Sequence, residues 1–325
     1  MIIVTGGAGL IGSAVVCQLN EQGQDDIIIV DHLGNGEKWR NLASLRFRDY
    51  VEKERFLHQI GGSLAEERIE AIIHLGACSS TTESDASYLV ANNFEYSKRL
   101  AIFALNCGAR FVYASSAATY GNGSLGFKDD ESHLVDLRPL NAYGYSKQLF
   151  DLWLLRKGLT GNVAGLKYFN VYGPNEHHKG DMRSVVLKAF EQIKESGEMS
   201  LFRSHHPDYD DGEQLRDFVY VKDAARMTIF FLEHTTANGI FNIGTGTARS
   251  WNDLAKALFA ALGYQERIKY IDMPEPIRSK YQYYTCAETT KLKEAGYDGK
   301  TTNLEDAITD YVQNYLLREQ FMGDT

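Results

Sequence analysis

A glycine-rich segment near the start of the chain constrains its fold more than any other feature. The segment follows a short apolar run at 2–5, reads Thr5-Gly6-Gly7-Ala8-Gly9-Leu10-Ile11-Gly12, and leads into a helical pattern over 14–22. Glycines let the chain turn sharply and let a pyrophosphate approach the backbone, while the following helix presents its free N–H groups. Asp31 ends the next apolar run, where a carboxylate that binds a ribose hydroxyl is expected. We therefore expect a strand–turn–helix unit that binds a dinucleotide.

Apolar runs and helical patterns alternate through the first half of the chain. Runs at 27–31, 71–75, 110–115 and 163–169 read as buried strands, and patterns over 87–106 and 145–157 read as helices. Such alternation predicts a parallel sheet with helices on both faces. After residue 170 the loops lengthen and the strands shorten. We expect a Rossmann-type, doubly wound α/β domain over 1–170 that also receives segments near 215–245. A smaller α/β domain over 171–325 is expected mainly to bind substrate.

Composition excludes several classes of function. The chain has 325 residues and a formal net charge of −9, and it contains no block of Lys or Arg, so we expect no nucleic-acid partner. It contains no apolar stretch of ~18 residues and no signal-peptide pattern at its start, so we expect a cytoplasmic protein without a membrane partner. The four cysteines form no CxxC pair, and we expect no metal site.

A second motif carries acid–base chemistry. Tyr143 and Lys147 are four residues apart in a helical pattern and therefore lie on one face of the helix. A neighbouring ammonium and an oxidised nicotinamide ring would lower the pKa of the phenol from ~10, so that Tyr143 could exchange a proton while hydride moves. Ser116, or less favourably Thr119, follows the predicted strand at 110–115 and would hydrogen-bond the reacting oxygen.

These residues leave the choice between NAD and NADP open. Asp31 favours NAD because a carboxylate repels a ribose 2′-phosphate. Lys38, Arg40 and Lys53 follow closely enough in sequence to neutralise such a phosphate, or they form a solvated cationic surface.

The motifs together resemble those of the nucleotide-sugar enzymes of the extended short-chain dehydrogenase/reductase family. The segments TGGAGLIG, ASSAATYG, YGYSK, KYFNVYGP and RDFVYVKD occur here in the family's order, and the resemblance covers nearly the whole chain. A narrower resemblance, carried by GACSSTTE at 76–83, HKG at 178–180 and Tyr281-Gln282, is to the members that invert C6″ of an ADP-linked heptose. Those members supply heptose for the inner core of lipopolysaccharide.

The resemblance implies a tightly held NADP, which moves the cofactor expectation from NAD to NADP. It assigns to the cofactor, besides the glycines Gly6, Gly9 and Gly12, the residues Leu10, Ile11, Asp31, His32, Lys38, Lys53, Leu75, Gly76, Ala77, Cys78, Ser79, Asn92, Lys147, Val171 and Lys179.

The implied reaction oxidises C6″ to an aldehyde and returns hydride to the opposite face. Two faces require two acid–base groups, for which Tyr143 and Lys179 are the candidates, with Lys147 and Ser116 beside them. Lys179 has an alternative role as a phosphate or cofactor contact. The resemblance assigns to the ADP-heptose substrate Ser79, Ser116, Asn170, Asp181, Lys188, Phe202, Arg203, Ser204, His205, Arg216 and Tyr281.

The sequence departs from the family pattern at Asp181, where a small hydroxyl residue is common, at Lys188, where a His is often found, and in a longer loop over 203–212. One alternative is a 4-epimerase of the same fold that uses NAD. A 4,6-dehydratase is disfavoured because Ala117-Ala118 follow Ser116 in place of an acidic pair, and a cofactor sensor is disfavoured by Tyr143, Lys147 and Ser116 together. The resemblance also implies a homo-oligomer, with a pentamer as one form.

Overall fold

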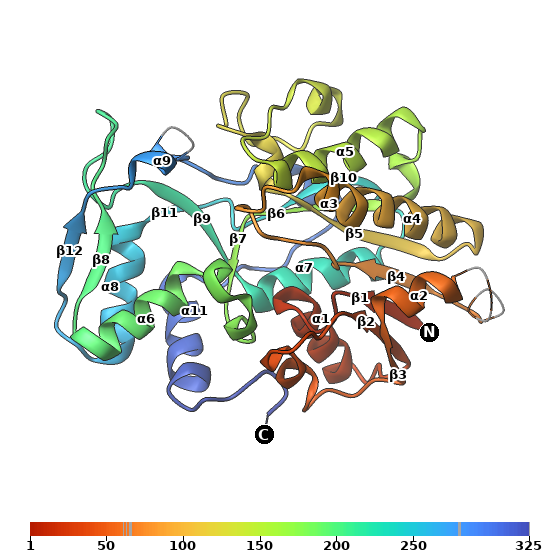
Figure 1. The fold of residues 1–325 in the computed structure, drawn as a ribbon, viewed down its shortest axis with the longest axis horizontal. Helices are drawn as coiled ribbons and strands as arrows, with labels where there is room; N and C mark the ends of the chain where they lie inside the picture. The colour runs from red at the N-terminus through yellow and green to blue at the C-terminus, as the bar shows by residue number, and fades with distance from the viewer. Residues whose placement is uncertain (61, 63, 65–66, 279–280, 325) are drawn as a thin grey trace.

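A seven-stranded, entirely parallel sheet forms the centre of the molecule (Figure 1). The computed structural model describes residues 1–324 except 61, 63, 65–66 and 279–280. The strand order is β10-β6-β5-β4-β1-β2-β3. The strands are β1 (Ile2–Thr5), β2 (Ile27–Asp31), β3 (Asp49–Glu52), β4 (Ala71–His74), β5 (Arg110–Ser116), β6 (Ala164–Tyr168) and β10 (Gly239–Ile243). The doubly wound α/β fold is confirmed, whereas β3 was not predicted because only one of its four residues is buried.

Helices cover both faces of this sheet because its buried strands are apolar on both sides. In β1, Ile2 and Val4 pack with α1 (Leu10–Glu21) and α7 (Val221–Glu233), whereas Ile3 packs with α4 (Tyr96–Asn106) and α5 (Ala142–Arg156). Two helices here are short: α2 (Lys53–Gln59) directly follows β3, and α3 (Ala86–Leu89) lies between β4 and α4. A π-helical turn over Val90–Glu95 joins α3 to α4, where the sequence predicted one continuous helix.

The later part of the chain forms two small sheets beside the main one, at the left of Figure 1. One pairs β11 (Ala248–Ser250), β9 (Leu215–Tyr220) and β7 (Asn170–Tyr172), and the other pairs β12 (Ile268–Ile271) with β8 (Met199–Phe202). Helices α6 (Val185–Ser196), α8 (Trp251–Leu262) and α11 (Leu304–Asp310) pack there, and α9 (Glu275–Arg278) and α10 (Thr290–Glu294) are short. The division into two domains at residue 170 stays a prediction.

The strand order places a binding crevice at the carboxyl end of β1. From β1 the chain builds outward to β2 and β3 and then crosses to β4 on the other side of β1, so the direction of strand addition reverses between β1 and β4. Ligands of open α/β sheets bind at such a reversal. None of the helices in the described ranges is both long and apolar enough to cross a bilayer.

Candidate active site

The turn after β1 requires glycine. Gly6 has φ +70°, a left-handed conformation that glycine adopts without strain. A Cβ added to Gly12 would lie 2.1 Å from the Gly6 carbonyl oxygen, so the turn and the first turn of α1 are in direct contact. In the described chain no side chain caps α1, which begins at Leu10. Its first N–H groups and its dipole therefore remain available to a phosphate, and the turn fits a dinucleotide pyrophosphate.

Asp31 closes this turn from the neighbouring strand. Its Oδ2 accepts a hydrogen bond from the Ala8 N–H at 2.8 Å, and its Oδ1 accepts from the His32 N–H at 2.7 Å. The Lys38 Nζ lies 2.5 Å from the same Oδ1. The carboxylate is thus bound to the turn and paired with a cation, which reduces the negative charge that it presents to a ligand.

A cavity of about 380 Å³ extends from Asp31 toward α4. The Lys53 ammonium donates to the Asn92 side-chain oxygen and lies 5.4 Å from the centroid of the Tyr96 ring. Besides Asp31 and Lys38, seven residues that the sequence assigned to the cofactor line this cavity: Gly6, His32, Lys53, Gly76, Ala77, Cys78 and Asn92.

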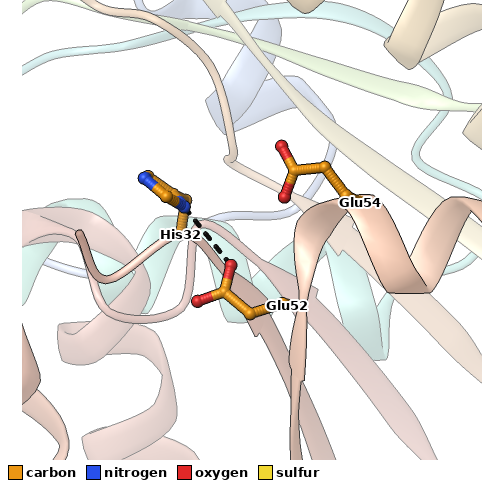
Figure 2. Close-up of side chains that lie close together, drawn as sticks. All are labelled: His32, Glu52 and Glu54. Carbon is orange, nitrogen blue, oxygen red and sulfur yellow. Dashed lines mark hydrogen bonds and ion pairs between the residues drawn. The ribbon is translucent and has the colours of Figure 1, made fainter.

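Figure 2 shows a cluster formed by His32 after β2, Glu52 at the end of β3 and Glu54 on α2, of which His32 and Glu54 also line that cavity. Their candidate ligand atoms lie within 4.8 Å of one another, and the His32 Nδ1 is 3.3 Å from Glu52. All three side chains are exposed to solvent, where acidic groups cluster readily without an ion. The cluster therefore contributes charge beside this cavity.

A second cavity, of about 300 Å³, shares Gly6, Asp31, Lys38, Gly76 and Ala77 with the first. The two therefore form one continuous crevice along the carboxyl edge of the sheet. This central cavity collects most of the residues predicted from sequence: Gly6, Gly9, Leu10, Ile11, Gly12, Asp31, Lys38, Leu75, Gly76, Ala77, Ser79, Ser116, Tyr143, Lys147, Val171 and Lys179.

Tyr143 and Lys147 occupy one face of α5, whose first turn is capped by the Asn141 side chain accepting from the Gly144 N–H at 2.8 Å. The pKa of the Tyr143 phenol lies above its usual value in the chain by itself, and its lowering by the Lys147 ammonium together with an oxidised nicotinamide stays a prediction. Burial raises the pKa of Tyr143, and a hydrogen bond with Ser116 opposes that rise. The Lys147 Nζ donates instead to the Ala114 carbonyl oxygen at 2.9 Å. Burial also lowers the pKa of Lys147 to about 8.

Ser116, and not Thr119, presents its hydroxyl to the site. Ser116 ends β5 and lines both the central cavity and a larger cavity beside it, and its Oγ accepts from the Ala118 N–H at 3.1 Å. Thr119 is fully buried, and its hydroxyl donates to the Ser116 carbonyl oxygen at 2.8 Å. Thr119 therefore shapes the turn that carries Ser116.

Lys179 reaches the central cavity from the short helix His177–Met182, opposite α5. Burial lowers its pKa, the Glu176 carboxylate opposes that shift, and Lys188 adds to it. Glu176 is completely buried and accepts from the Ser184 N–H and hydroxyl at 2.6 Å, which anchors this loop. Asn175, at φ +74°, donates to the Ser13 hydroxyl of α1 at 3.0 Å and so ties the loop to the pyrophosphate turn.

A third cavity, of about 860 Å³, opens beside Ser116 and Tyr143. The Arg216 guanidinium lies over the rings of Tyr281 (5.1 Å) and Trp251 (5.7 Å), and the Trp251 Nε1 donates to the Tyr281 hydroxyl at 3.0 Å. Of the predicted substrate residues, Ser116, Asn170, Arg216 and Tyr281 line this cavity.

The residues that line this cavity and the residues predicted to bind substrate overlap only in part. Polar lining residues that were not predicted include Thr81, Thr82, Glu83, Ser84, Asn141, Gln282 and Thr285, and 81–83 belong to the GACSSTTE run that carried the narrower resemblance. In the described part of the chain, six predicted substrate residues do not line any of the three cavities: Asp181, Lys188, Phe202, Arg203, Ser204 and His205. Lys188 instead donates to the Asp181 carbonyl oxygen at 2.6 Å.

The fold and the glycine turn are those of a nicotinamide-dependent enzyme. Residues 2–244 match the NAD dependent epimerase/dehydratase family, and the chain belongs to that family. It is 54% identical over 316 residues to the ADP-L-glycero-D-manno-heptose-6-epimerase of Nitratidesulfovibrio vulgaris strain Hildenborough, covering 97% of this chain and 98% of that protein. It is 48% identical to the enzyme of the same name from Fusobacterium nucleatum, and the alignment covers 98% of this chain and 99% of that protein.

Solved structures agree on the fold. The ADP-L-glycero-D-manno-heptose-6-epimerase of Helicobacter pylori is 26% identical, with a TM-score of 0.79 over 96% of this chain and 95% of that one. The UDP-glucose 4-epimerase of Thermotoga maritima is 28% identical, with the same TM-score over 98% and 99%. Because the two structures superpose equally well, the substrate assignment depends on sequence identity and on the site.

Proposed function

We propose that this chain epimerises C6″ of ADP-D-glycero-D-manno-heptose to the L-glycero form and so supplies heptose for the inner core of lipopolysaccharide. The observation that carries the proposal is the presence of two titratable side chains, Tyr143 on α5 and Lys179 on the loop over 177–182, in one cavity beside the glycine turn. Relatives of up to 54% identity carry the name of this enzyme.

The residues divide the work as follows. A bound nicotinamide cofactor supplies the hydride acceptor and donor. Tyr143 exchanges the proton of the C6″ oxygen on one face, and Ser116 holds that oxygen by a hydrogen bond. Lys179 exchanges the proton when the intermediate has turned its other face, and burial, which lowers the pKa of Lys179, favours its neutral amine. Arg216 binds the diphosphate of the substrate through its planar fork.

We propose NADP as the cofactor, held by Lys38 and Lys53 at its 2′-phosphate. Asp31 is paired with Lys38, so its charge repels a phosphate less than an isolated carboxylate would. Lys53 contacts the neutral amide of Asn92, and within the described ranges it forms no ion pair, so its charge is available to a phosphate.

Replacing Lys53 by methionine tests the choice of cofactor. The K53M variant is expected to bind NADP about 10- to 100-fold more weakly, because one charge-assisted hydrogen bond is worth about 1.5–3 kcal/mol, and to bind NAD almost unchanged. Titration calorimetry with NADP and with NAD measures the two dissociation constants, and their ratio is compared between the variant and the wild type. Lys157, exposed at the end of α5, provides the K157M control. Equal losses for NADP and NAD would contradict a 2′-phosphate contact.

The substrate is tested by proton NMR of the purified protein with ADP-D-glycero-β-D-manno-heptose and no added cofactor. Appearance of the L-glycero epimer beside the starting sugar is expected, because hydride removed from C6″ returns to the same carbon. Conversion of UDP-hexoses but not of the heptose would overturn the assignment and favour the 4-epimerase that uses NAD.

We also propose that the protein forms a homo-oligomer. Light scattering after gel filtration measures the molar mass of the assembly and so the number of copies.

A further inference from the structure

A completely buried ion pair joins β6 to α5, the helix that carries Tyr143 and Lys147. The Lys167 Nζ of β6 is 2.9 Å from the Asp151 Oδ2 of α5, and both side chains have 0% exposure. Two charges removed from water are retained only where a close partner and further hydrogen bonds compensate for their lost hydration. The reaction proposed above does not use either residue, so the position of this pair requires its own explanation.

Both members of the pair bind the strand end that carries Ser116. Asp151 accepts from the Ser115 hydroxyl at 2.7 Å and from the Tyr113 hydroxyl at 2.9 Å, both on β5. Lys167 donates to the Thr119 hydroxyl at 2.5 Å, and Thr119 in turn donates to the Ser116 carbonyl oxygen. The segment 115–119 is therefore held from one side by the carboxylate and from the other by the ammonium.

The same carboxylate lies on the catalytic face of α5. Tyr143, Lys147 and Asp151 are spaced by four residues, so they follow one another along that face. Burial lowers the pKa of Lys147, whereas the negative charge of Asp151 raises it. His74 of β4 also faces this region, but burial lowers its pKa to about 3, and it is neutral at physiological pH.

We propose that the Asp151–Lys167 pair is a positioning unit that holds the Ser116 turn against the catalytic face of α5 and supplies the negative charge that keeps Lys147 protonated. Neither residue touches the reacting atoms. The proposal rests on proton and hydride transfer at Ser116, Tyr143 and Lys147, but not on the identity of the sugar. It can therefore be tested with whichever nucleotide sugar the wild-type protein converts.

The test is the pH profile of kcat/KM for the D151N variant, which removes the charge and keeps hydrogen-bonding atoms. The wild-type profile is expected to fall on its alkaline side as Lys147 loses its proton. In D151N this fall should begin about one pH unit lower, because a buried opposite charge has been removed. Turnover at neutral pH should decrease about 100-fold as the Ser116 turn shifts.

Two further variants separate positioning from stability. The K167M/D151N double variant removes both charges and should recover the thermal stability that K167M alone loses, while its alkaline fall stays displaced. If D151N does not fold, the pH profile of kcat/KM for the double variant tests the proposal in its place. The control is D223N, which alters an equally buried carboxylate that binds Thr302 away from these cavities. The proposal would be overturned if kcat/KM of D151N or of the double variant fell at the same alkaline pH as that of the wild type. It would also be overturned if the fall of kcat/KM were displaced in D223N.

Discussion

Replacing Tyr143 by phenylalanine is expected to lower kcat by a factor of about 10³, since a positioned general acid–base contributes about 10²–10⁴. The ring fills the same space, so the packing of α5 and the cavity should be preserved. Burial raises the pKa of this phenol, and its hydroxyl faces the cavities that also contain Ser116. The measurement is steady-state turnover followed by proton NMR, with circular dichroism to verify folding.

The matched control for this variant lies two residues further along the same helix. Tyr145 is 50% exposed, and it does not line any of the three cavities formed by the described residues. Y145F should therefore convert substrate at the wild-type rate. A Y143F variant that retains more than about a tenth of wild-type turnover would show that another group transfers the proton. Lys179 would then be examined first.

Replacing Gly12 by alanine is expected to abolish cofactor retention. A Cβ at this position would lie 2.1 Å from the Gly6 carbonyl oxygen and 2.8 Å from Gly7 Cα. Both atoms are backbone, so a change of rotamer cannot relieve the collision, and the turn itself must move. Alanine favours a helix by about 1 kcal/mol over glycine, but overpacking costs about 1–3 kcal/mol, so the collision prevails. Dinucleotide affinity should fall at least 100-fold, measured by calorimetry and by absorbance of the purified protein.

A second glycine provides the control for this variant. Gly161 lies in the short helix Thr160–Asn162, where an added Cβ would meet no atom within 4 Å. G161A should keep both its affinity for the dinucleotide and its melting temperature. If G12A bound dinucleotide as tightly as G161A, the turn after β1 would not be the pyrophosphate site.

Local spacing explains why much of the candidate site could be predicted from the sequence. The Gly6–Gly12 turn and the Tyr143–Lys147 pair each lie within one strand–turn–helix or one helical turn, where chain geometry determines which side chains meet. Asp31 required one further step, because it lies on the neighbouring strand. Its bond to the Ala8 N–H follows from the parallel pairing of β1 with β2.

The residues on long loops could not be predicted in the same way. Resemblance assigned Phe202–His205 to the substrate, yet in the described chain these residues do not line the three cavities. Their place depends on how β8, β12 and the loop after β8 pack on the rest of the molecule. By contrast, Thr81 and Thr82 line the third cavity, beside Ser116 and Tyr143, although their sequence segment had carried only a family resemblance.

The sequence by itself determined the parallel sheet, the glycine turn and the pairing of Tyr143 with Lys147, because these depend on apolar patterning and on spacings of a few residues. Only the tertiary structure decided the proton affinities, because burial and distant charges control them: it raises the pKa of Tyr143 and lowers that of Lys147. It also decided which distant residues support the site. Asn93 binds the Cys78 backbone and the Ser146 hydroxyl, and Asp151 joins β5 to β6 through Lys167. Such contacts join segments far apart in sequence, so they arise only when the sheet and its helices are packed together.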